Sequence, residues 1–414
     1  MDHHPATAMN RLSPLLWLIV LIGAWLSPAF AQELPAPEPG SPAPRIGLLT
    51  MSPGEEYWSR FGHNAILVED PVRGLRLSYN YGYFDFDQPG FFWRFARGQM
   101  RYQLVVMPVE DDLRTYATEG RGVQLQWLAL APDQARELAR FLDWNARPEN
   151  AEYTYDYFTS NCSTRVRDAL DQALGGALSK QLSGASHGLT YRSEALRLGA
   201  DVPWLYLGMH AALGPRADRP LSIWDEAFVP QRLAAALERA RGSDGQPLVT
   251  QTHALMPDRL GLEQSQPPQR RGLFATAGIG FAIVLLMLLR PQAGPVARRT
   301  GATLAATFWL VCGLGGLVLA GLWAGTDHVA AWGNENLLLF NPLVLILLLA
   351  SPALWRGVQT SDLARRIGWI LLVCVAIAVF LRFLPFRIQS NGDFIVLLGP
   401  IHAVLAWRLA RRSH

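Results

Sequence analysis

The stretch YDYFTSNCSTRVRDAL, residues 155–170, places a cysteine where an apolar helical pattern begins. Apolar residues recur between 166 and 174 at the spacing of one helical face, and a glycine pair then ends the pattern. Ser160 or Asn161 can cap such a helix at its N-terminus. The stretch therefore predicts an α-helix with Cys162 in its first turn.

The first turn of a helix is a favourable place for a thiolate. The unpaired N–H groups and the positive end of the helix dipole favour the charged form over the thiol, and they can also stabilise an oxyanion. Asn161 and Arg165 are the candidates for this oxyanion-stabilising, positive environment. Cys312 and Cys374 lie in long apolar stretches, so Cys162 has no partner for a disulfide within its own domain. A reactive nucleophile and an inert buried thiol both remain open.

A nucleophilic cysteine needs a base, and His63 is the preferred candidate. It opens an alternating apolar run in RFGHNAILVED, residues 60–70, and a base on a sheet strand keeps its geometry better than one on a loop. The other histidines of this half of the chain, His187, His210 and His253, lie in weakly patterned segments. A purely structural role for His63 is the alternative.

A third polar group could orient the imidazole of that histidine. On the next predicted strand, Ser78 and Asn80 share one face by the period of two, and Asn80 would complete a Cys-His-Asn set. Asp85 and Asp87 in the FDFD sequence are rivals.

The surrounding pattern predicts an α+β domain with an antiparallel sheet. Residues 132–145 form an amphipathic helical pattern, and residues 180–260 are expected to contain loops and short helices. Five alternating apolar runs are bounded by turn residues or charges: residues 45–51, 63–69, 75–84, 103–109 and 123–130.

The N-terminal region indicates export. Residues 1–31 are expected to be a signal peptide, with Arg11 before the apolar run PLLWLIVLIGAWL and AFA before Gln32; an uncleaved anchor helix is the alternative. Residues 32–44 are a Pro-rich linker. Residues 45–262 then have the composition of a globular domain, and 263–414 that of a membrane domain.

Five apolar stretches of the membrane domain are long enough to span a bilayer: about 273–289, 303–324, 337–354, 367–384 and 394–409. Arginines cluster after the first, third and fifth stretches. If these clusters are cytoplasmic, the positive-inside rule is satisfied and the globular domain lies on the outer side, as the signal peptide also predicts. The net charge of +3 is therefore no indication of nucleic-acid binding.

Two further segments can contact lipid. The connection between the second and third stretches carries Asp327, His328, Asn334 and Asn336, which can bind head groups, dock the globular domain or simply form a solvated connector. The sequence GYFDFDQPGFFWRF, residues 82–95, can rest on lipid or line an acyl groove, or belong to the core. Its last residues alternate as in a half-buried strand.

Several motifs in the same order resemble one known family. They are FGHNAI, YNYGYFDFD, FARGQMRY, ENAEYTYDYFTSNCSTRVRDAL and ADRPLSIWDEAFVP, followed by TDHVAAWGNENLLLFNPL between two membrane stretches. Together they look like the alternative lipoprotein N-acyltransferase Lnb and its relatives. The resemblance implies a circularly permuted papain-like domain of the NlpC kind, with Cys162 as nucleophile and His63 as base, a chain order shared with the lecithin:retinol acyltransferase group.

The resemblance also implies an activity. An acyl chain would move from a phospholipid through a Cys162 thioester to the N-terminal amine of an apolipoprotein, in the bacterial inner membrane, with the catalytic domain in the periplasm and the C-terminus in the cytoplasm. We expect no cofactor and no metal site. The alternatives are a periplasmic cysteine peptidase or amidase acting on cell-wall peptides, and a non-catalytic membrane-anchored assembly factor.

Overall fold

The computed structural model describes residues 42–242 and 244–410. The expected signal peptide and most of the expected linker, residues 32–41, lie outside this range. From Ala43 onward the chain forms one compact unit, with a mixed α/β domain followed by five apolar helices.

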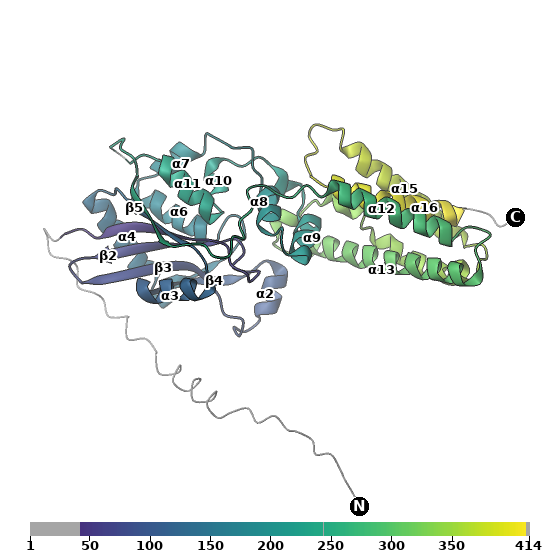
Figure 1. Cartoon of the computed structure of the whole chain (residues 1–414), viewed down its shortest axis with the longest axis horizontal. Helices are drawn as coiled ribbons and strands as arrows, with labels where there is room; N and C mark the ends of the chain where they lie inside the picture. Colours follow the sequence, from purple (N-terminus) through teal and green to yellow (C-terminus); the bar gives the residue numbers. More distant parts are fainter. Residues whose placement is uncertain (1–41, 243, 411–414) are drawn as a thin grey trace, which may run out of the picture. The chain divides into compact units, whose positions relative to one another are not determined.

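The α/β domain is built on an antiparallel seven-stranded sheet in the order β6-β4-β3-β2-β1-β5-β7 (Figure 1). The strands are β1 (Arg45–Met51), β2 (His63–Asp70), β3 (Leu75–Tyr83), β4 (Arg101–Pro108), β5 (Val123–Leu128), β6 (Glu152–Thr154) and β7 (Val249–Met256). The five central strands confirm the five alternating runs. In the pairing of β1 with β2, Met51 lies opposite His63, which fixes the position of that histidine at the end of its strand.

Helices cover both faces of the sheet. On one face, Leu48, Ile66 and Tyr79 pack with buried residues of α4 (Pro132–Asn145), α6 (Cys162–Ala173) and α11 (Pro230–Arg239). On the other, Met51 and Leu67 pack with α3 (Val109–Glu119). Both predicted helices, residues 132–145 and the one beginning at Cys162, are confirmed.

Shorter helices complete the domain: α2 (Phe91–Arg97), α5 (Pro148–Ala151), α7 (Ala177–Leu182), α8 (Tyr191–Leu198), α9 (Pro203–Ala212), η1 (Pro215–Asp218) and α10 (Ile223–Glu226). Two expectations are wrong here. Residues 93–95 form part of helix α2 instead of a half-buried strand, and none of the helix's residues is buried. The expectation of only loops and short helices in 180–260 missed β7, an exposed edge strand whose side chains show no apolar alternation.

Five helical segments are long and apolar enough to cross a membrane. They are α12 (Arg271–Leu288), α13 (Pro295–Gly325), the segment Glu335–Arg356, α15 (Asp362–Leu381) and α16 (Gly392–Ala410). The third segment is assembled from η3 (Glu335–Leu338), η4 (Pro342–Ala350) and α14 (Ser351–Arg356). Its first two pieces, η3 and η4, are 3-10 helices. Asn341 caps the start of η4, because its side-chain oxygen accepts a hydrogen bond from the Leu343 N–H at 3.0 Å. The short turn η2 (Val329–Ala331) precedes it.

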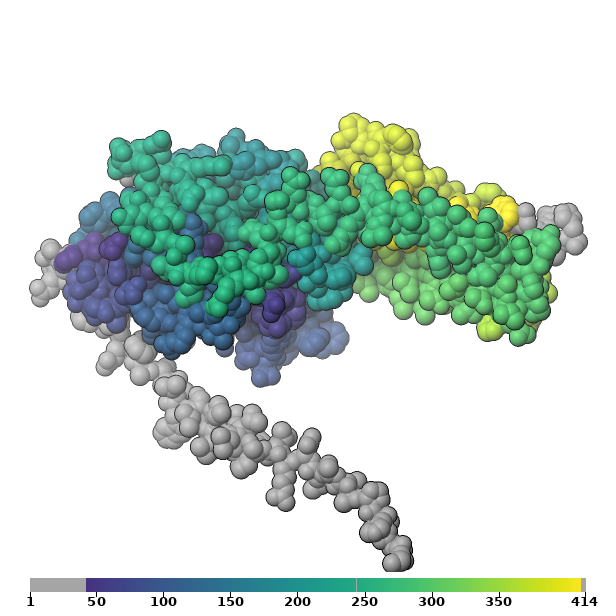
Figure 2. Space-filling model, viewed as in Figure 1, coloured from purple at the N-terminus to yellow at the C-terminus, as the bar shows by residue number. Residues whose placement is uncertain are grey.

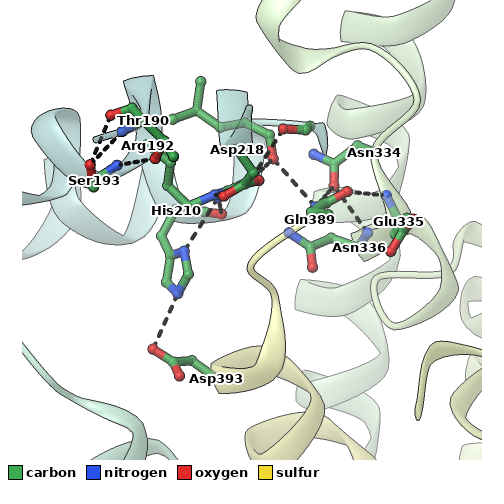
Figure 3. A network of polar contacts seen from close by, with 12 residues as sticks. Thr190, Arg192, Ser193, His210, Asp218, Asn334, Glu335, Asn336, Gln389 and Asp393 are labelled. Carbon is green, nitrogen blue, oxygen red and sulfur yellow. Dashed lines mark hydrogen bonds and ion pairs between the residues drawn. The ribbon is translucent and has the colours of Figure 1, made fainter. Parts of the chain in front are cut away.

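A buried polar network joins the α/β domain to the membrane helices (Figure 3). Asn334 donates to the carbonyls of Ala211 and Ala212 at 2.8 and 2.9 Å, and Gln389 donates to Asn334 at 2.8 Å. His210 of α9 lies 3.3 Å from Asp393 of α16. These contacts hold the α/β domain against the ends of the membrane helices.

Arg192 anchors the same network from the side of the α/β domain. It forms an ion pair with Asp218 at 2.9 Å and donates to the carbonyls of His210 and Leu213, both at 2.6 Å. Asn336 also donates to the Ala211 carbonyl, at 2.9 Å. Two of the expected loop residues, Asn334 and Asn336, therefore contact protein at this junction.

Candidate functional site

Cys162 is the first residue of α6, and Asn161 caps the helix. The Asn161 carboxamide oxygen accepts a hydrogen bond from the Thr164 N–H at 2.9 Å, and the Thr164 hydroxyl accepts one from the Asn161 N–H at 2.8 Å. The Asn161 amide group donates to the carbonyls of Tyr157 and Phe228 at 3.0 and 2.9 Å. The Asn161 side chain thus holds the chain segments that precede and flank the cysteine.

A second buried contact fixes α6 against strand β2. The Ser163 hydroxyl donates to the Asn64 side-chain oxygen at 2.8 Å, and it lies 2.6 Å from the Ala227 carbonyl. Ser163 directly follows Cys162, and Asn64 directly follows His63. This bond therefore sets the register between the residues that carry the thiol and the imidazole.

Cys162 and His63 change each other's ionisation. Burial opposes the thiolate, but the charge of His63, its hydrogen bond and the backbone N–H groups of Asn64 and Ser163 lower the pKa of Cys162 below its ordinary value. Burial likewise opposes the imidazolium, but the charge of Cys162 and hydrogen bonds with Cys162 and Asn80 raise the pKa of His63. Opposite shifts in a contacting pair are typical of a thiolate–imidazolium pair.

Asn80 orients the imidazole. Its side-chain oxygen lies 3.0 Å from His63 Nε2, and its amide nitrogen donates to Asp112 at 3.0 Å and to the Ser78 hydroxyl at 3.1 Å. A carboxylate only accepts hydrogen bonds, so the amide nitrogen must face Asp112 and the oxygen must face His63. His63 Nε2 then carries a proton, and Nδ1 is the ring nitrogen left for Cys162.

Asp112 continues the hydrogen-bonded series from His63 through Asn80, and it is the residue of that series that the sequence did not predict. It lies in α3, a helix that was not expected, and its side chain is buried. A buried acid next to Val109 on one helical face was the available signal. The rivals Asp85 and Asp87 are both exposed, and Asp85 accepts the Asp87 N–H at 2.9 Å in a local turn.

Tyr153 is a further polar group beside the thiol. Its hydroxyl is buried and has no hydrogen-bond partner among residues 42–242 and 244–410. Burial, and then the charge of Cys162, raises the pKa of Tyr153 well above its usual range. The Arg165 guanidinium lies 4.4 Å from the Tyr153 ring centroid, so the expected positive charge is placed beside this tyrosine.

Gly82 of strand β3 lies beside Cys162. It has a φ of +105°, which favours glycine, and a Cβ added there would lie 3.5 Å from Cys162 Cβ. A side chain at this position would be strained by the positive φ and would touch Cys162.

A series of aromatic rings leads from the thiol to the protein surface. Burial, and then the charge of Cys162, raises the pKa of Tyr155 well above its usual range. The Tyr155 ring stacks on Tyr102 with centroids 4.2 Å apart and meets Tyr157 edge-on at 5.7 Å. Tyr102 in turn stacks on Phe84 at 4.8 Å.

The rings continue toward helices α2 and α9. We call the whole set the aromatic belt: Tyr57, Trp58, Phe84, Phe86, Phe91, Phe95, Tyr102, Tyr155, Tyr157 and Trp204. Phe86 contacts both Phe91 of α2 and Trp58, with centroids 5.2 and 5.8 Å apart. Tyr57 contacts Trp204 of α9 at 5.9 Å. The belt thus joins the surroundings of Cys162 to two helices with exposed apolar side chains.

Helix α2 presents the most exposed of these side chains. Phe92 and Trp93 are 85% and 74% exposed, and the blue segment that carries them projects from the surface in Figure 2. The residues that follow α13 hold this helix, because the Asp327 N–H donates to the Arg97 carbonyl at 2.7 Å and His328 Nε2 lies 3.0 Å from the Phe95 carbonyl. Asp327 and His328, expected as a lipid or docking loop, therefore lie against α2.

Gly98 permits this close approach. It ends α2 with a φ of +74°, and a Cβ there would lie 2.9 Å from the His328 backbone nitrogen. His328 also stacks on Tyr157 of the aromatic belt at 6.1 Å. The belt therefore reaches the end of a helix long and apolar enough to cross a membrane.

The other histidines of the α/β domain have different surroundings. His187 lies 2.6 Å from Glu226, His210 is buried beside Asp393, and His253 is exposed on strand β7. Within the part of the chain that the structure describes, no group of three or more His, Cys, Asp or Glu residues could hold a metal ion. His63 is thus the histidine that the fold places with Cys162.

The fold and the site define a class: a protein with five membrane-spanning helices, whose α/β domain pairs a cysteine at a helix N-terminus with a strand histidine. Two family models match this chain, the Lnb N-terminal periplasmic domain over residues 42–194 and the Lnb transmembrane domain over residues 274–410. The chain belongs to the Lnb family, as its motifs indicated. It is a membrane protein with a periplasmic domain. No curated protein and no solved structure matched it.

Proposed function

We propose that this protein is a cysteine-dependent acyltransferase that moves an acyl chain from a phospholipid to the N-terminal amine of a bacterial apolipoprotein. The observation that carries the proposal is the series Cys162, His63, Asn80 with opposite pKa shifts in its first two members. Membership of the Lnb family supports an acyltransferase.

In the first half-reaction, the Cys162 thiolate attacks the ester carbonyl of the phospholipid. The carbonyl oxygen becomes an oxyanion, and the N–H groups at the start of α6 and the Tyr153 hydroxyl are the donors we assign to it. The bond to the glycerol oxygen then breaks. His63 gives its proton to that oxygen, so a lysophospholipid leaves and an acyl thioester remains on Cys162.

In the second half-reaction, the α-amine of the diacylglyceryl-cysteine attacks the thioester. Neutral His63 accepts the amine proton, the C–S bond breaks, and the amide product leaves. The thiolate and the imidazolium are restored, so no further reactant is needed. Because the acyl group waits on Cys162 between the two substrates, the kinetics should be ping-pong.

The aromatic belt supports a lipid substrate. The belt extends from Tyr155, beside the thiol, to the exposed ring of Trp204 on α9 and to helix α2. Helix α2 also carries the exposed side chains of Phe92 and Trp93. Aromatic side chains are enriched at the interface between membrane and water. We assign the belt as the path by which an acyl chain reaches Cys162 from the outer leaflet of the inner membrane.

We also propose the circularly permuted papain-like relationship for the α/β domain. In support, the cysteine helix packs on the sheet that carries His63, and His63 precedes Cys162 in the chain. The arginine clusters after the first, third and fifth spans support a cytoplasmic C-terminus.

The proposal is tested with the full chain in vesicles that contain phospholipid and a synthetic diacylglyceryl-cysteinyl peptide. Wild-type protein should release lysophospholipid and N-acyl peptide in equal amounts, Cys162→Ala and His63→Ala should release neither, and Cys312→Ala should retain activity. Cleavage of cell-wall peptides without acylation would replace the proposal with a hydrolase. Absence of both products from the wild-type protein, together with unimpaired function of Cys162→Ala in the cell, would leave a non-catalytic assembly factor.

A further inference from the structure

A cavity of about 350 Å³ lies where the α/β domain meets the ends of the membrane helices. Three parts of the chain form it: η1 of the α/β domain, the end of α13 with its following turn, and the segment between α15 and α16. Its chemically distinctive lining residues are Arg216, Arg219, Arg387, Trp323, Trp332 and Phe386. None of them belongs to the Cys162 site or the aromatic belt.

The arginines that line the cavity outnumber the acidic side chains that pair with them. Arg387 pairs with Glu335 at 3.3 Å, whereas Arg216 and Arg219 have no ion pair within residues 42–242 and 244–410. The nearest acid in sequence, Asp218, does not line the cavity and pairs with Arg192 at 2.9 Å. Arg216 and Arg219, both exposed, therefore leave net positive charge at one side of the cavity, and this charge attracts an anion.

Arg216 and Arg387 each have a contact that limits the movement of the guanidinium group. The Arg216 guanidinium lies 5.3 Å from the Trp332 ring centroid, and the Trp332 indole N–H donates to the Thr326 carbonyl at 3.0 Å. Held guanidinium groups lose less freedom when they bind, and the guanidinium geometry matches a phosphate through two parallel hydrogen bonds.

The location of the cavity indicates that this anion is part of a lipid. Trp323 lies in the last turn of α13, and Phe386 lies in the connection that follows α15; both are exposed. Aromatic residues are enriched at the level where membrane segments end and lipid head groups begin. The volume also exceeds what a bare phosphate fills and falls in the range of about 300–1,000 Å³ that is typical of ligand pockets. Apolar rings beside arginines fit a ligand with an anionic and an apolar part.

We propose that this cavity, lined by Arg216, Arg219 and Arg387, binds the phosphate-bearing head group of a membrane phospholipid. The site is separate from Cys162, and its connection to the aromatic belt is the turn from His328 to Trp332. It therefore holds a lipid at the edge of the belt through its head group. Binding here does not depend on the chemistry proposed for Cys162.

The test is equilibrium binding to the full-length chain carrying Cys162→Ala, purified in detergent, so that acyl transfer plays no part. Three probes are titrated by calorimetry: short-chain phosphatidylglycerol, short-chain diacylglycerol and inorganic phosphate. We expect the phospholipid to bind and the other two to bind at least about tenfold more weakly. Adding Arg216→Gln and Arg219→Gln together should weaken phospholipid binding about tenfold or more, while Arg140→Gln, an exposed arginine on α4, should leave it unchanged.

Three outcomes would overturn the proposal. Equal binding of inorganic phosphate would show a site for a free anion, and equal binding of diacylglycerol would show a purely apolar site. Unchanged phospholipid binding by the folded Arg216→Gln and Arg219→Gln protein would remove the arginines from the site. Arg216→Lys guards against a folding artefact: it retains the charge but loses the two parallel hydrogen bonds, so it should bind the phospholipid with an affinity between those of the wild-type arginine and the Arg216→Gln variant.

Discussion

Replacing His63 by alanine should raise the pH at which Cys162 becomes reactive. In the native site the charge of His63 and its hydrogen bond are the largest effects that lower the pKa of the thiol, and they act against burial. The His63→Ala variant loses the charge and the hydrogen bond that lower the pKa of Cys162, and it keeps the burial that raises this pKa. The pKa of Cys162 should therefore rise to that of an ordinary cysteine or above it.

The size of the effect follows from the thiolate fraction. An ordinary thiol with a pKa of about 8.5 is only about 0.3% ionised at pH 6. Only the thiolate is alkylated, so the alkylation rate of Cys162 at pH 6 should fall in His63→Ala, with an upper limit of about 300-fold for a wild-type thiol that is fully ionised. Above about pH 9.5, where an ordinary thiol is mostly ionised, the two proteins should differ by only a small factor.

The assay is a time course of iodoacetamide alkylation of the full-length protein from pH 5 to 10, about one unit apart, read by mass spectrometry of the peptide that contains Cys162. His253→Ala is the matched control, because His253 is an exposed histidine on edge strand β7 and should give the wild-type profile. Coincident profiles for wild type and His63→Ala would refute the ion pair. So would a wild-type profile that follows an ordinary thiol.

Three further changes test other parts of the account. Asn80→Ala should lower kcat about 100-fold, because the imidazole loses its hydrogen bond at Nε2, while Cys162 alkylation at high pH stays normal; an unchanged kcat would exclude the orienting role. Asn161→Ala should destabilise the fold by about 2–4 kcal/mol in urea titrations, through the lost helix cap and two buried carbonyls left without donors, and a loss below about 0.5 kcal/mol would contradict this. Phe92→Ser with Trp93→Ser should raise the KM for vesicle phospholipid and leave kcat and the melting temperature unchanged, whereas an unchanged KM would argue against a lipid contact for α2.

The centre of the sheet could be predicted because burial leaves a pattern in the sequence. Strands β1 to β5 alternate apolar side chains between two covered faces, and the helix at Cys162 has an apolar stripe against that sheet. The same period of two placed Asn80 on the face of Ser78, next to the strand of His63. Three of the site's residues were therefore accessible from local patterns alone.

The missed elements lack that pattern. Strand β7 is an exposed edge, and α2 has no buried residue, so neither shows a periodic apolar face. Only the glycines at both ends of α2, each in the left-handed region, mark its limits. Asp112 was missed because it stands beside Glu110 and Asp111 in an acidic first turn that resembles a solvated surface, and its contact with Asn80 comes from helix packing that no local period reveals.

The arginine-lined cavity illustrates a second limit. Arg216 and Arg387 are far apart in the sequence, and each alone looks like an ordinary surface charge. Their meeting depends on how the α/β domain sits on the membrane helices through Asn334 and Gln389 (Figure 3). Such a site becomes visible only in the folded chain.

The most direct test of the central claim is to trap the acyl group on Cys162. The full-length protein is incubated with phospholipid that carries a labelled acyl chain and no acceptor, and the label is mapped by mass spectrometry. The account predicts label on Cys162 that hydroxylamine releases and that is absent from Cys162→Ser and His63→Ala. Label that never appears on wild-type protein, or that appears equally in these variants, would contradict a thioester at this site.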